Sequence, residues 1–359
     1  MMDYSKLFSE SPYSMDFSRK RMFLEETLNS LTRMHFSNCS EYKKILSLLK
    51  YDCNKTYSVE DLPFIPVSLF KKFDLISVPN ESIVKRLHSS GTTGQSVSKI
   101  YLDSDNVLLQ TKALNSIIGS YIGKQRLPLI ILDSKQSISD RKNYSARGAG
   151  IIGFSIFGKN SIYALDENMN FSVEKIIEYI QAHKTEPILL FGYTYMIWLY
   201  VVEYLEKHNI SLNIPNGIIF HIGGWKKIKD AAISFEEFNL RLKKCLGNVR
   251  IHNYYGMVEQ LGSVFVECEC GHMHCSNFSD VIVRDENDFS VLPNGEKGLI
   301  EVLSVLPVSY PGHVLLTQDL GEILGQDDCP CGRKGKYFRL HGRVKYAEIR
   351  GCSDTFERS

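Results

Sequence analysis

The sequence has almost no net charge and no segment suited to crossing a membrane. Lysine and arginine together number 42 against 41 aspartates and glutamates, so no broad field draws the chain toward nucleic acid or an anionic lipid surface. Residues 1–20 lack an apolar core and mix acids with bases, which argues against a secretory signal. The longest apolar run, residues 187–202, is too short to span a bilayer and reads as a buried strand running into a helix. We therefore expect a cytoplasmic protein with no membrane span and no nucleic-acid partner.

The chain also lacks internal repeats, low-complexity tracts and an even set of cysteines. Nine cysteines without a secretory signal argue against a disulfide framework. The remaining roles for these cysteines are free thiols, metal ligands or a catalytic thiol. With 359 residues and 43% hydrophobic composition, the chain can bury a sizeable core and form two or three domains or subdomains.

Short apolar segments alternate with helical ones through the middle of the chain, after helical patterns in residues 1–75. The strand-like runs are residues 128–133, 187–192, 217–224 and 249–256. This alternation is typical of a layered α/β fold with a partly parallel sheet. After residue 262 the pattern changes to short strands and turns, which indicates a smaller β subdomain.

These changes in pattern divide the chain into four parts. We expect an N-terminal helical segment (1–80), an α/β core (81–262), a small β subdomain (263–351) and a C-terminal tail (352–359).

A run of small and hydroxylated residues separates two β-prone segments within residues 86–103. The run consists of Ser89, Ser90, Gly91, Thr92, Thr93 and Gly94. Backbone N–H groups in such a run converge on an anion such as a triphosphate, and the hydroxyls add donors. No Gly-Lys-Ser/Thr follows, so this is not a Walker A loop. The run indicates either a nucleotide site of another architecture or an ordinary polar turn.

Soft metal donors lie on two segments, "CECGHMHC" (268–275) and "CPCG" (329–332). Thiolates and imidazoles on two such short segments, here called knuckles, are typical of a closed, structural Zn²⁺ site. The set would combine Cys329 and Cys331 with Cys268 or Cys270 and with His272, His274 or Cys275. The spacing is not a standard Cys-x-x-Cys pair, so the alternative is a group of reduced cysteines packed as small apolar side chains.

Several motifs occur in the order found in one superfamily. The segment "SSGTTGQSVSK" (89–99) resembles the phosphate loop of adenylate-forming ligases, "NYYGMVEQ" (253–260) resembles their Tyr-Gly-x-x-Glu motif, and Gly342-Arg343 resembles their hinge motif. "TQDLG" (317–321) stands where those enzymes have Thr-Gly-Asp.

Within that superfamily the chain most closely resembles the LuxE-type acyl-protein synthetases, relatives of the phenylacetate-CoA ligases. The further segments that carry this resemblance are "IPVSLFK" (65–71), "DRKNYSARGAGIIGFSIFG" (140–158), "LLFGYTYMIW" (189–198) and "EIRGC" (348–352).

The resemblance implies the large α/β domain of adenylate-forming ligases, with the usual C-terminal domain truncated because only eight residues follow Gly351. It also implies that ATP activates a carboxylic acid, expected to be a fatty acid, to acyl-AMP, that the acyl group moves to an in-chain cysteine, and that an acyl-CoA reductase partner receives it. The alternatives are a ligase that forms a CoA thioester or loads an external carrier, and a catalytically silent scaffold. Acyl chain length and oligomeric state are not readable.

The resemblance also assigns residues to ATP and Mg²⁺. Ser89 to Gly94 would hold the phosphates, and Lys99 is the candidate loop lysine, although the family often places it where this chain has Val97. Glu259 would be the Mg²⁺ ligand, with a surface acid as the alternative.

Further residues are assigned to the base and the ribose. Tyr255 and Gly256 would pack against adenine, with Gly223 and Gly224 allowing a close approach of the base. Asp319 would accept hydrogen bonds from the ribose hydroxyls. Arg343 would contact ribose or phosphate, with a solvated hinge arginine as the alternative.

Cys352 is, by resemblance, the acyl acceptor. The neighbouring Arg350 would lower the pKa of its thiol toward the reactive thiolate. The alternative is an incidental surface cysteine. Because a carboxylate nucleophile needs no base, we expect His221 and His252 to be packed residues rather than catalysts.

Overall fold

The computed structural model describes residues 4–89, 97–139, 146–224 and 233–344, which form two compact units. The first unit combines residues 4–121 with residues 256–344, and the second consists of residues 122–255. The four-part division expected from the sequence stays a prediction. Within the described ranges, no helix has the length and apolar character that a membrane crossing requires.

Helices dominate the N-terminal part of the first unit, as the sequence predicts. They are α1 (Ser5–Ser9), α2 (Phe17–Asn38), α3 (Ser40–Leu48) and α4 (Ser104–Ile122), with the 3-10 turns η1 (Val59–Asp61), η2 (Val67–Lys71), η3 (Asn80–Ser82) and η7 (Val258–Gln260). The Asp16 side chain caps α2 by accepting a hydrogen bond from the backbone N–H of Arg19 at 2.8 Å. Leu24, Leu28 and Leu31 recur at helical spacing and form its buried face.

The strands of the first unit form an antiparallel sheet and a separate hairpin. The hairpin pairs β2 (Lys85–His88) with β3 (Lys99–Leu102). The sheet has the order β11-β12-β13-β14-β10-β9, and β1 adds to β13 in parallel. Its strands are β1 (Ile65–Pro66), β9 (Phe265–Glu267), β10 (Met273–His274), β11 (Ser279–Arg284), β12 (Gly298–Ser304), β13 (Val314–Gln326) and β14 (Lys336–Arg343). The short strands predicted after residue 262 are confirmed.

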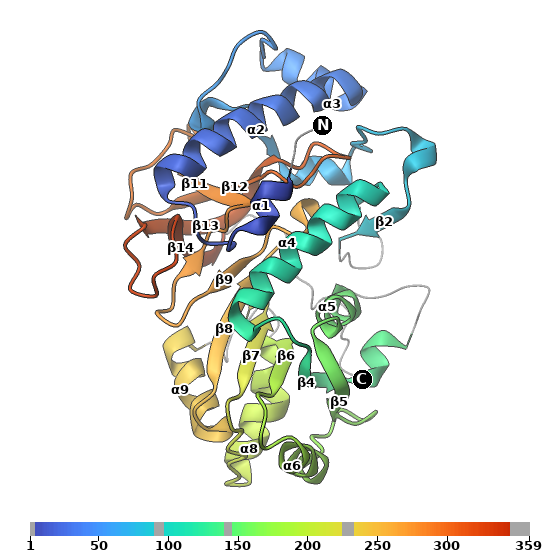
Figure 1. The fold of residues 1–359 in the computed structure, drawn as a ribbon, viewed down its shortest axis with the longest axis vertical. Helices are drawn as coiled ribbons and strands as arrows, with labels where there is room; N and C mark the ends of the chain where they lie inside the picture. Colours follow the sequence, from blue (N-terminus) through green and yellow to red (C-terminus); the bar gives the residue numbers. More distant parts are fainter. Residues whose placement is uncertain (1–3, 90–96, 140–145, 225–232, 345–359) are drawn as a thin grey trace. The chain divides into compact units, whose positions relative to one another are not determined.

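Helix α2 lies along the antiparallel sheet of the first unit, blue beside orange in Figure 1. Its buried Lys20 lies 3.8 Å from the carboxylate of Asp280 on β11, and Lys336 of β14 lies 3.5 Å from the same carboxylate. Farther along α2, the hydroxyl of Thr32 lies 2.9 Å from Nε2 of His313. The first unit therefore buries side chains from both ends of the sequence in one core.

The second unit is a parallel sheet with helices between its strands. The order is β5-β4-β6-β7-β8, from β4 (Leu127–Ser134), β5 (Gly158–Leu165), β6 (Leu189–Tyr193), β7 (Ile218–Ile222) and β8 (Arg250–Tyr255). Every residue of β4 and β6 is buried, as expected of strands covered on both faces.

The helices of the second unit are α5 (Ala146–Ser155), α6 (Val173–Ala182), α7 (Thr194–Met196), α8 (Glu203–Lys207) and α9 (Phe235–Leu246), with the 3-10 turn η4 (Lys135–Ile138) and the π-helical segment η5 (Ile197–Val202). Strand β6 runs directly into α7, η5 and α8. This confirms that residues 187–202 are a buried strand followed by a helix. The α/β class expected from the sequence is therefore also confirmed.

Candidate functional site

The first residue of the glycine-rich run, Ser89, directly follows β2. The backbone N–H of Ser89 donates to the carbonyl oxygen of Ser98 at 3.0 Å, and the N–H of Ser98 donates to the Ser89 hydroxyl at 2.8 Å. These two bonds hold together the chain segments on either side of the run. Ser90, Gly91, Thr92, Thr93 and Gly94 lie outside the described residues, so their role in binding phosphate stays a prediction.

Glu259 occupies the 3-10 turn η7, and it is almost completely buried, with 9% of its surface exposed. Burial raises the pKa of its carboxyl above the ordinary value, and the Ser98 hydroxyl and the charges of Lys71 and Arg343 act in the opposite direction. Its charged form is thus incompletely compensated by the protein. A divalent cation would supply the missing compensation, so the site fits the predicted Mg²⁺ role.

The turn that carries Glu259 is fixed by its neighbours. The Gln260 side chain donates to the carbonyl oxygens of Val302 at 3.2 Å and Gly312 at 3.0 Å. A Cβ atom at Gly312 would lie 2.7 Å from the backbone oxygen of Glu259, so the close approach requires glycine. The alternative that Glu259 is an ordinary surface acid is therefore wrong, although its metal role stays a prediction.

Asp319 and Arg343 face each other on paired strands. They are register partners in β13 and β14, and Arg343 Nε donates to Asp319 Oδ1 at 2.9 Å. The residue before Arg343 is Gly342, with φ of +98°, a backbone conformation that favours glycine. The Asp319 backbone N–H donates to the Thr317 hydroxyl at 3.1 Å. The structure thus brings together two residues that the sequence assigned to the nucleotide, and that assignment stays a prediction.

Lys99 forms an exposed ion pair with Asp74, at 3.2 Å. The same Asp74 oxygen accepts a hydrogen bond from the hydroxyl of Tyr101 at 2.8 Å. The Asp74 carboxylate is therefore the common partner of Lys99 and Tyr101.

In the second unit, Gly223 and Gly224 follow β7, and Tyr255 is the last residue of β8. Gly256 is the first residue of the second segment of the first unit. The Thr194 hydroxyl donates to the carbonyl oxygen of Gly223 at 3.0 Å. The role of these four residues in adenine binding stays a prediction.

The strand-end histidines are buried, as expected. Burial lowers the pKa of His221 to about 3, so this ring is neutral near pH 7. Its Nδ1 lies 2.9 Å from the Thr194 hydroxyl. His252 is also completely buried, and its ring packs against Phe220 at 5.1 Å between centroids.

Four of the predicted metal-ligating residues come together in the first unit. The ligand atoms of Cys268, His274, Cys329 and Cys331 all lie within 4.8 Å of one another. Cys268 and Cys329 Sγ are 3.9 Å apart, and Cys331 Sγ lies 3.3 Å from His274 Nε2. Tetrahedral zinc with Zn–S bonds near 2.3 Å places its sulfur atoms about 3.8 Å apart. We call these four residues the Cys/His cluster, and its donor set and spacing fit Zn²⁺.

Local pairing explains how the cluster forms. Cys268 directly follows β9, His274 ends β10, and Cys329 and Cys331 lie in the turn between β13 and β14. Strand β10 pairs with both β9 and β14, which brings the two knuckles to one place.

The other predicted ligands lie outside this set. Cys270 is exposed, and its backbone N–H donates to Cys268 Sγ at 3.3 Å. Cys275 is buried near Lys20 and Asp280, and burial raises the pKa of its thiol. His272, which the sequence left open, lies with Nδ1 at 3.3 Å from Cys329 Sγ and stacks on Tyr337.

Arg333 borders the cluster and was not singled out in the sequence. Although burial acts to raise the pKa of Cys331, hydrogen bonding with Arg333 contributes to a net lowering, which favours a metal-binding thiolate. The guanidinium also pairs with Glu269 at 2.7 Å and lies 4.2 Å from the centroid of the Tyr121 ring. The only sequence signal was its place two residues after Cys331.

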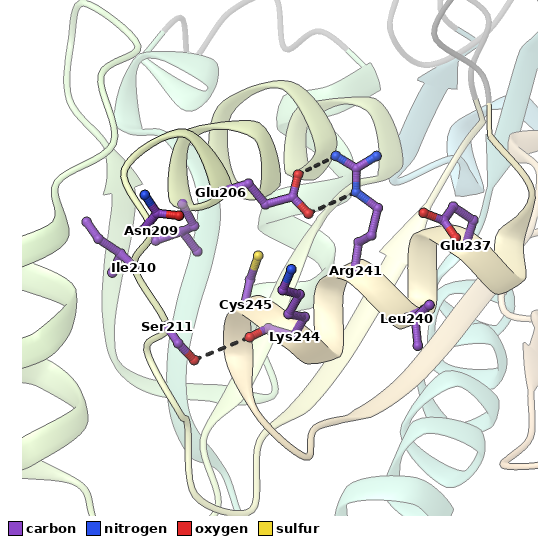
Figure 2. A pocket seen from close by; sticks show the side chains of 10 residues that line it. Glu206, Asn209, Ile210, Ser211, Glu237, Leu240, Arg241, Lys244 and Cys245 are labelled. Carbon is purple, nitrogen blue, oxygen red and sulfur yellow. Dashed lines mark hydrogen bonds and ion pairs between the residues drawn. The ribbon is translucent and has the colours of Figure 1, made fainter.

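A groove of about 580 Å³ lies in the second unit, and Figure 2 shows its lining. Arg241 of α9 donates from Nε to Glu206 of α8 at 2.8 Å and covers the Trp198 ring at 4.3 Å. Burial raises the pKa of the Cys245 thiol, which makes it a poor nucleophile. None of the residues assigned to chemistry from the sequence lines this groove, so we do not place the reaction there.

Comparison with solved structures identifies the class of fold. The fold is similar to that of a 2-hydroxyisobutyryl-CoA ligase in an open conformation in complex with 2-HIB-AMP and CoA, with a TM-score of 0.71, 14% identity and coverage of 93% of this chain and 77% of that chain. The post-adenylation state of that ligase matches with a TM-score of 0.70, 15% identity and coverage of 93% and 69%. The fold is that of adenylate-forming ligases.

The chain belongs to the family described as "Acyl-protein synthetase, LuxE", whose sequence model matches residues 3–359. It is 22% identical to the long-chain-fatty-acid–luciferin-component ligase of Vibrio harveyi over 97% of this chain and 90% of the relative. The ligase of the same name from Aliivibrio fischeri is also 22% identical, over 97% and 91%. This chain is therefore an adenylate-forming ligase, an enzyme that activates a carboxylic acid as its acyl-adenylate.

Proposed function

We propose that this enzyme uses ATP and Mg²⁺ to activate a long-chain fatty acid, takes the acyl group onto Cys352 and passes it to an acyl-CoA reductase. The names of the Vibrio harveyi and Aliivibrio fischeri relatives support the fatty acid. Within this chain, the observation that carries the proposal is the buried Glu259 beside Ser98, in the same unit as the Asp319–Arg343 pair.

In the first step, a carboxylate oxygen of the acid attacks the α-phosphorus of ATP, the bond from that phosphorus to the β-phosphate bridging oxygen breaks, and pyrophosphate leaves with the electron pair. No proton is transferred, so positioning and charge neutralisation supply the catalysis. Asp319 would accept hydrogen bonds from the ribose hydroxyls, and Arg343, held at 2.9 Å from Asp319, would contribute positive charge.

Glu259 would hold Mg²⁺ through its carboxylate oxygens. When bound, the ion would neutralise charge on the phosphates. The protein contributes a carboxylate whose position is fixed by Gln260 and Gly312 before the ligands arrive.

In the second step, the Cys352 thiolate attacks the carbonyl carbon of the acyl-adenylate. A carbon–sulfur bond forms, the carbon–oxygen bond to AMP breaks, and AMP leaves with the electron pair. The product is an acyl thioester. Because this step needs a reduced thiol, we place the enzyme in a reducing, cytoplasmic environment.

The proposal is tested by following pyrophosphate exchange into ATP with a series of saturated fatty acids and aromatic acids. We expect exchange that requires both Mg²⁺ and a fatty acid, with little exchange for benzoate or phenylacetate. Chain length should matter because each buried CH₂ contributes roughly 0.8 kcal/mol to binding. Exchange only with aromatic acids would refute the fatty-acid assignment, and no exchange with any acid would favour the silent scaffold.

We also propose that the Cys/His cluster binds one structural Zn²⁺. Its three sulfur donors and one imidazole nitrogen would fill the tetrahedron and leave no open position for water. The ion would join the turn between β13 and β14 to the region of β9 and β10, and it would take no part in the chemistry.

Replacing Cys329 with alanine should release the zinc and lower the free energy of unfolding by about 4 kcal/mol, the contribution of a ligand present at a thousand times its dissociation constant. Elemental analysis should find one zinc per wild-type chain, and thermal unfolding should report the loss of stability. Cys270→Ala is the matched control, because that exposed cysteine lies outside the cluster. The Cys270→Ala protein should therefore still bind one zinc per chain. If the wild-type protein contains no zinc and Cys329→Ala is as stable as wild type, the alternative of reduced cysteines packed as apolar side chains would be supported instead.

A further inference from the structure

The proposed adenylation step needs positive charge near the phosphates, and three side chains of the first unit bear on this requirement. Lys99 is paired with Asp74 at 3.2 Å, and Arg343 is paired with Asp319 at 2.9 Å. The third is Lys71, the last residue of η2 in the segment "IPVSLFK". It is half-buried, whereas the adjacent Lys72 is exposed.

Aromatic packing fixes the position of η2 relative to Glu259. The completely buried Phe70 packs edge-to-face against Tyr310, with ring centroids 6.1 Å apart. Two residues beyond Tyr310, the Cβ position of Gly312 is 2.7 Å from the backbone oxygen of Glu259. Both η2 and η7 also pack against β3. Lys71 follows Phe70 directly, so its backbone is held against the segment around Tyr310 that also contacts the turn carrying Glu259.

The two neighbouring turns carry side chains of opposite charge, Lys71 in η2 and Glu259 in η7. A carboxylate with a nearby ammonium group matches what a metal–polyphosphate requires. The carboxylate is a hard ligand for the ion, and the ammonium is a point charge for the phosphate oxygens.

We propose that Lys71 is the lysine that binds the phosphate chain of ATP and stabilises the leaving pyrophosphate, the role for which the sequence suggested Lys99. Lys71 forms no bond and transfers no proton. It neutralises the charge that accumulates on the β-phosphate as its bridging oxygen separates from the α-phosphorus. This inference rests on the proposed function and adds a phosphate-binding residue to it.

The test is fatty-acid-dependent pyrophosphate exchange by full-length Lys71→Met, Lys71→Arg, Lys72→Met and Lys99→Met. We expect Lys71→Met to lose about 100-fold in kcat/KM for ATP, in line with the loss of one group that stabilises developing charge. Lys71→Arg keeps the charge and should recover much of the loss. Lys72→Met is the matched control, one residue away, and should behave as wild type. Lys99→Met should lose less than Lys71→Met.

Inhibition by pyrophosphate separates phosphate binding from a structural role. The inhibition constant for pyrophosphate should rise at least tenfold in Lys71→Met while its thermal unfolding midpoint stays close to that of wild type. An active wild type with an unaffected Lys71→Met variant, or a larger loss in Lys99→Met, would overturn the inference and leave the proposed function standing. If the wild-type protein shows no pyrophosphate exchange with any of the acids, both the inference about Lys71 and the proposed function would be overturned.

Discussion

Incubation with ATP, Mg²⁺ and its preferred acid should raise the intact mass of the wild-type chain by one acyl group, and the Cys352→Ala variant should show no increase. The expected effect is complete, because removal of the sulfur removes the atom that forms the thioester. Hydroxylamine should release the acyl group from the wild type, since it cleaves thioesters. Acid-dependent pyrophosphate exchange should persist in the variant, because adenylation precedes the transfer.

The described cysteines provide the controls. Cys39 and Cys245 are buried, and burial raises the pKa of both thiols, so neither is a good nucleophile. Cys53 is exposed and serves as the matched control, because Cys53→Ala should acquire the acyl mass as wild type does. An adduct that persists in Cys352→Ala would exclude Cys352 as the sole acceptor. Pyrophosphate exchange without any adduct in wild type would point to CoA or an external carrier.

Glu259→Gln should lose about 1,000-fold in Mg²⁺-dependent adenylation yet be at least as stable as wild type at pH 7. The loss corresponds to roughly 4 kcal/mol of transition-state stabilisation. Glutamine preserves the shape of the side chain but cannot provide a charged ligand for the ion. The same substitution removes a buried charge, so activity and stability should change in opposite directions. Pyrophosphate exchange and thermal unfolding without ligands measure the two effects.

The pH dependence follows from the raised pKa of the Glu259 carboxyl. The folded chain keeps this proton at pH values where the unfolded chain, with an ordinary glutamate pKa of about 4.3, has lost it. As pH rises from that value through the folded pKa, this group therefore contributes progressively less stability. The Gln variant should lack this contribution, whereas wild-type adenylation should fall as the pH drops through the folded pKa. A Gln variant with near-normal exchange, or one strongly destabilised at pH 7, would contradict the assignment.

The sequence predicted the class of fold because its strands carry strong local patterns. The continuous apolar run of β6 and the helix after it were readable, since burial on both faces leaves an unbroken apolar segment. The pairing of β1 with β13 was not readable, because the two-residue strand Ile65–Pro66 has no periodicity and lies about 250 positions from its partner Leu315. Long-range pairing is decided by packing that a local pattern does not contain.

The candidate site was predicted with similar limits. The motif that contains Glu259 was recognisable, but its burial depends on Gly312 and Tyr310, which are distant in sequence. Lys99 was suggested by its place near the glycine-rich run, whereas its pairing with Asp74 depends on the fold. The two knuckles correctly indicated a cluster, yet spacing alone could not choose His274 over His272 and Cys275.

The composition of the first unit has a consequence for how the protein is made. In this unit, N-terminal residues contact residues that are synthesised much later. The Tyr4 hydroxyl donates to the carbonyl oxygen of Val305 at 2.8 Å, and Ile65 pairs with Leu315. The described part of the second unit is one continuous segment, residues 122–255, which can fold while translation continues. The apolar faces of the N-terminal helices therefore stay exposed to solvent until residues 256–343, which cover them, have left the ribosome. Chaperone demand and the slow step of maturation should therefore fall on the part that carries Glu259, because contacts between distant segments form slowly.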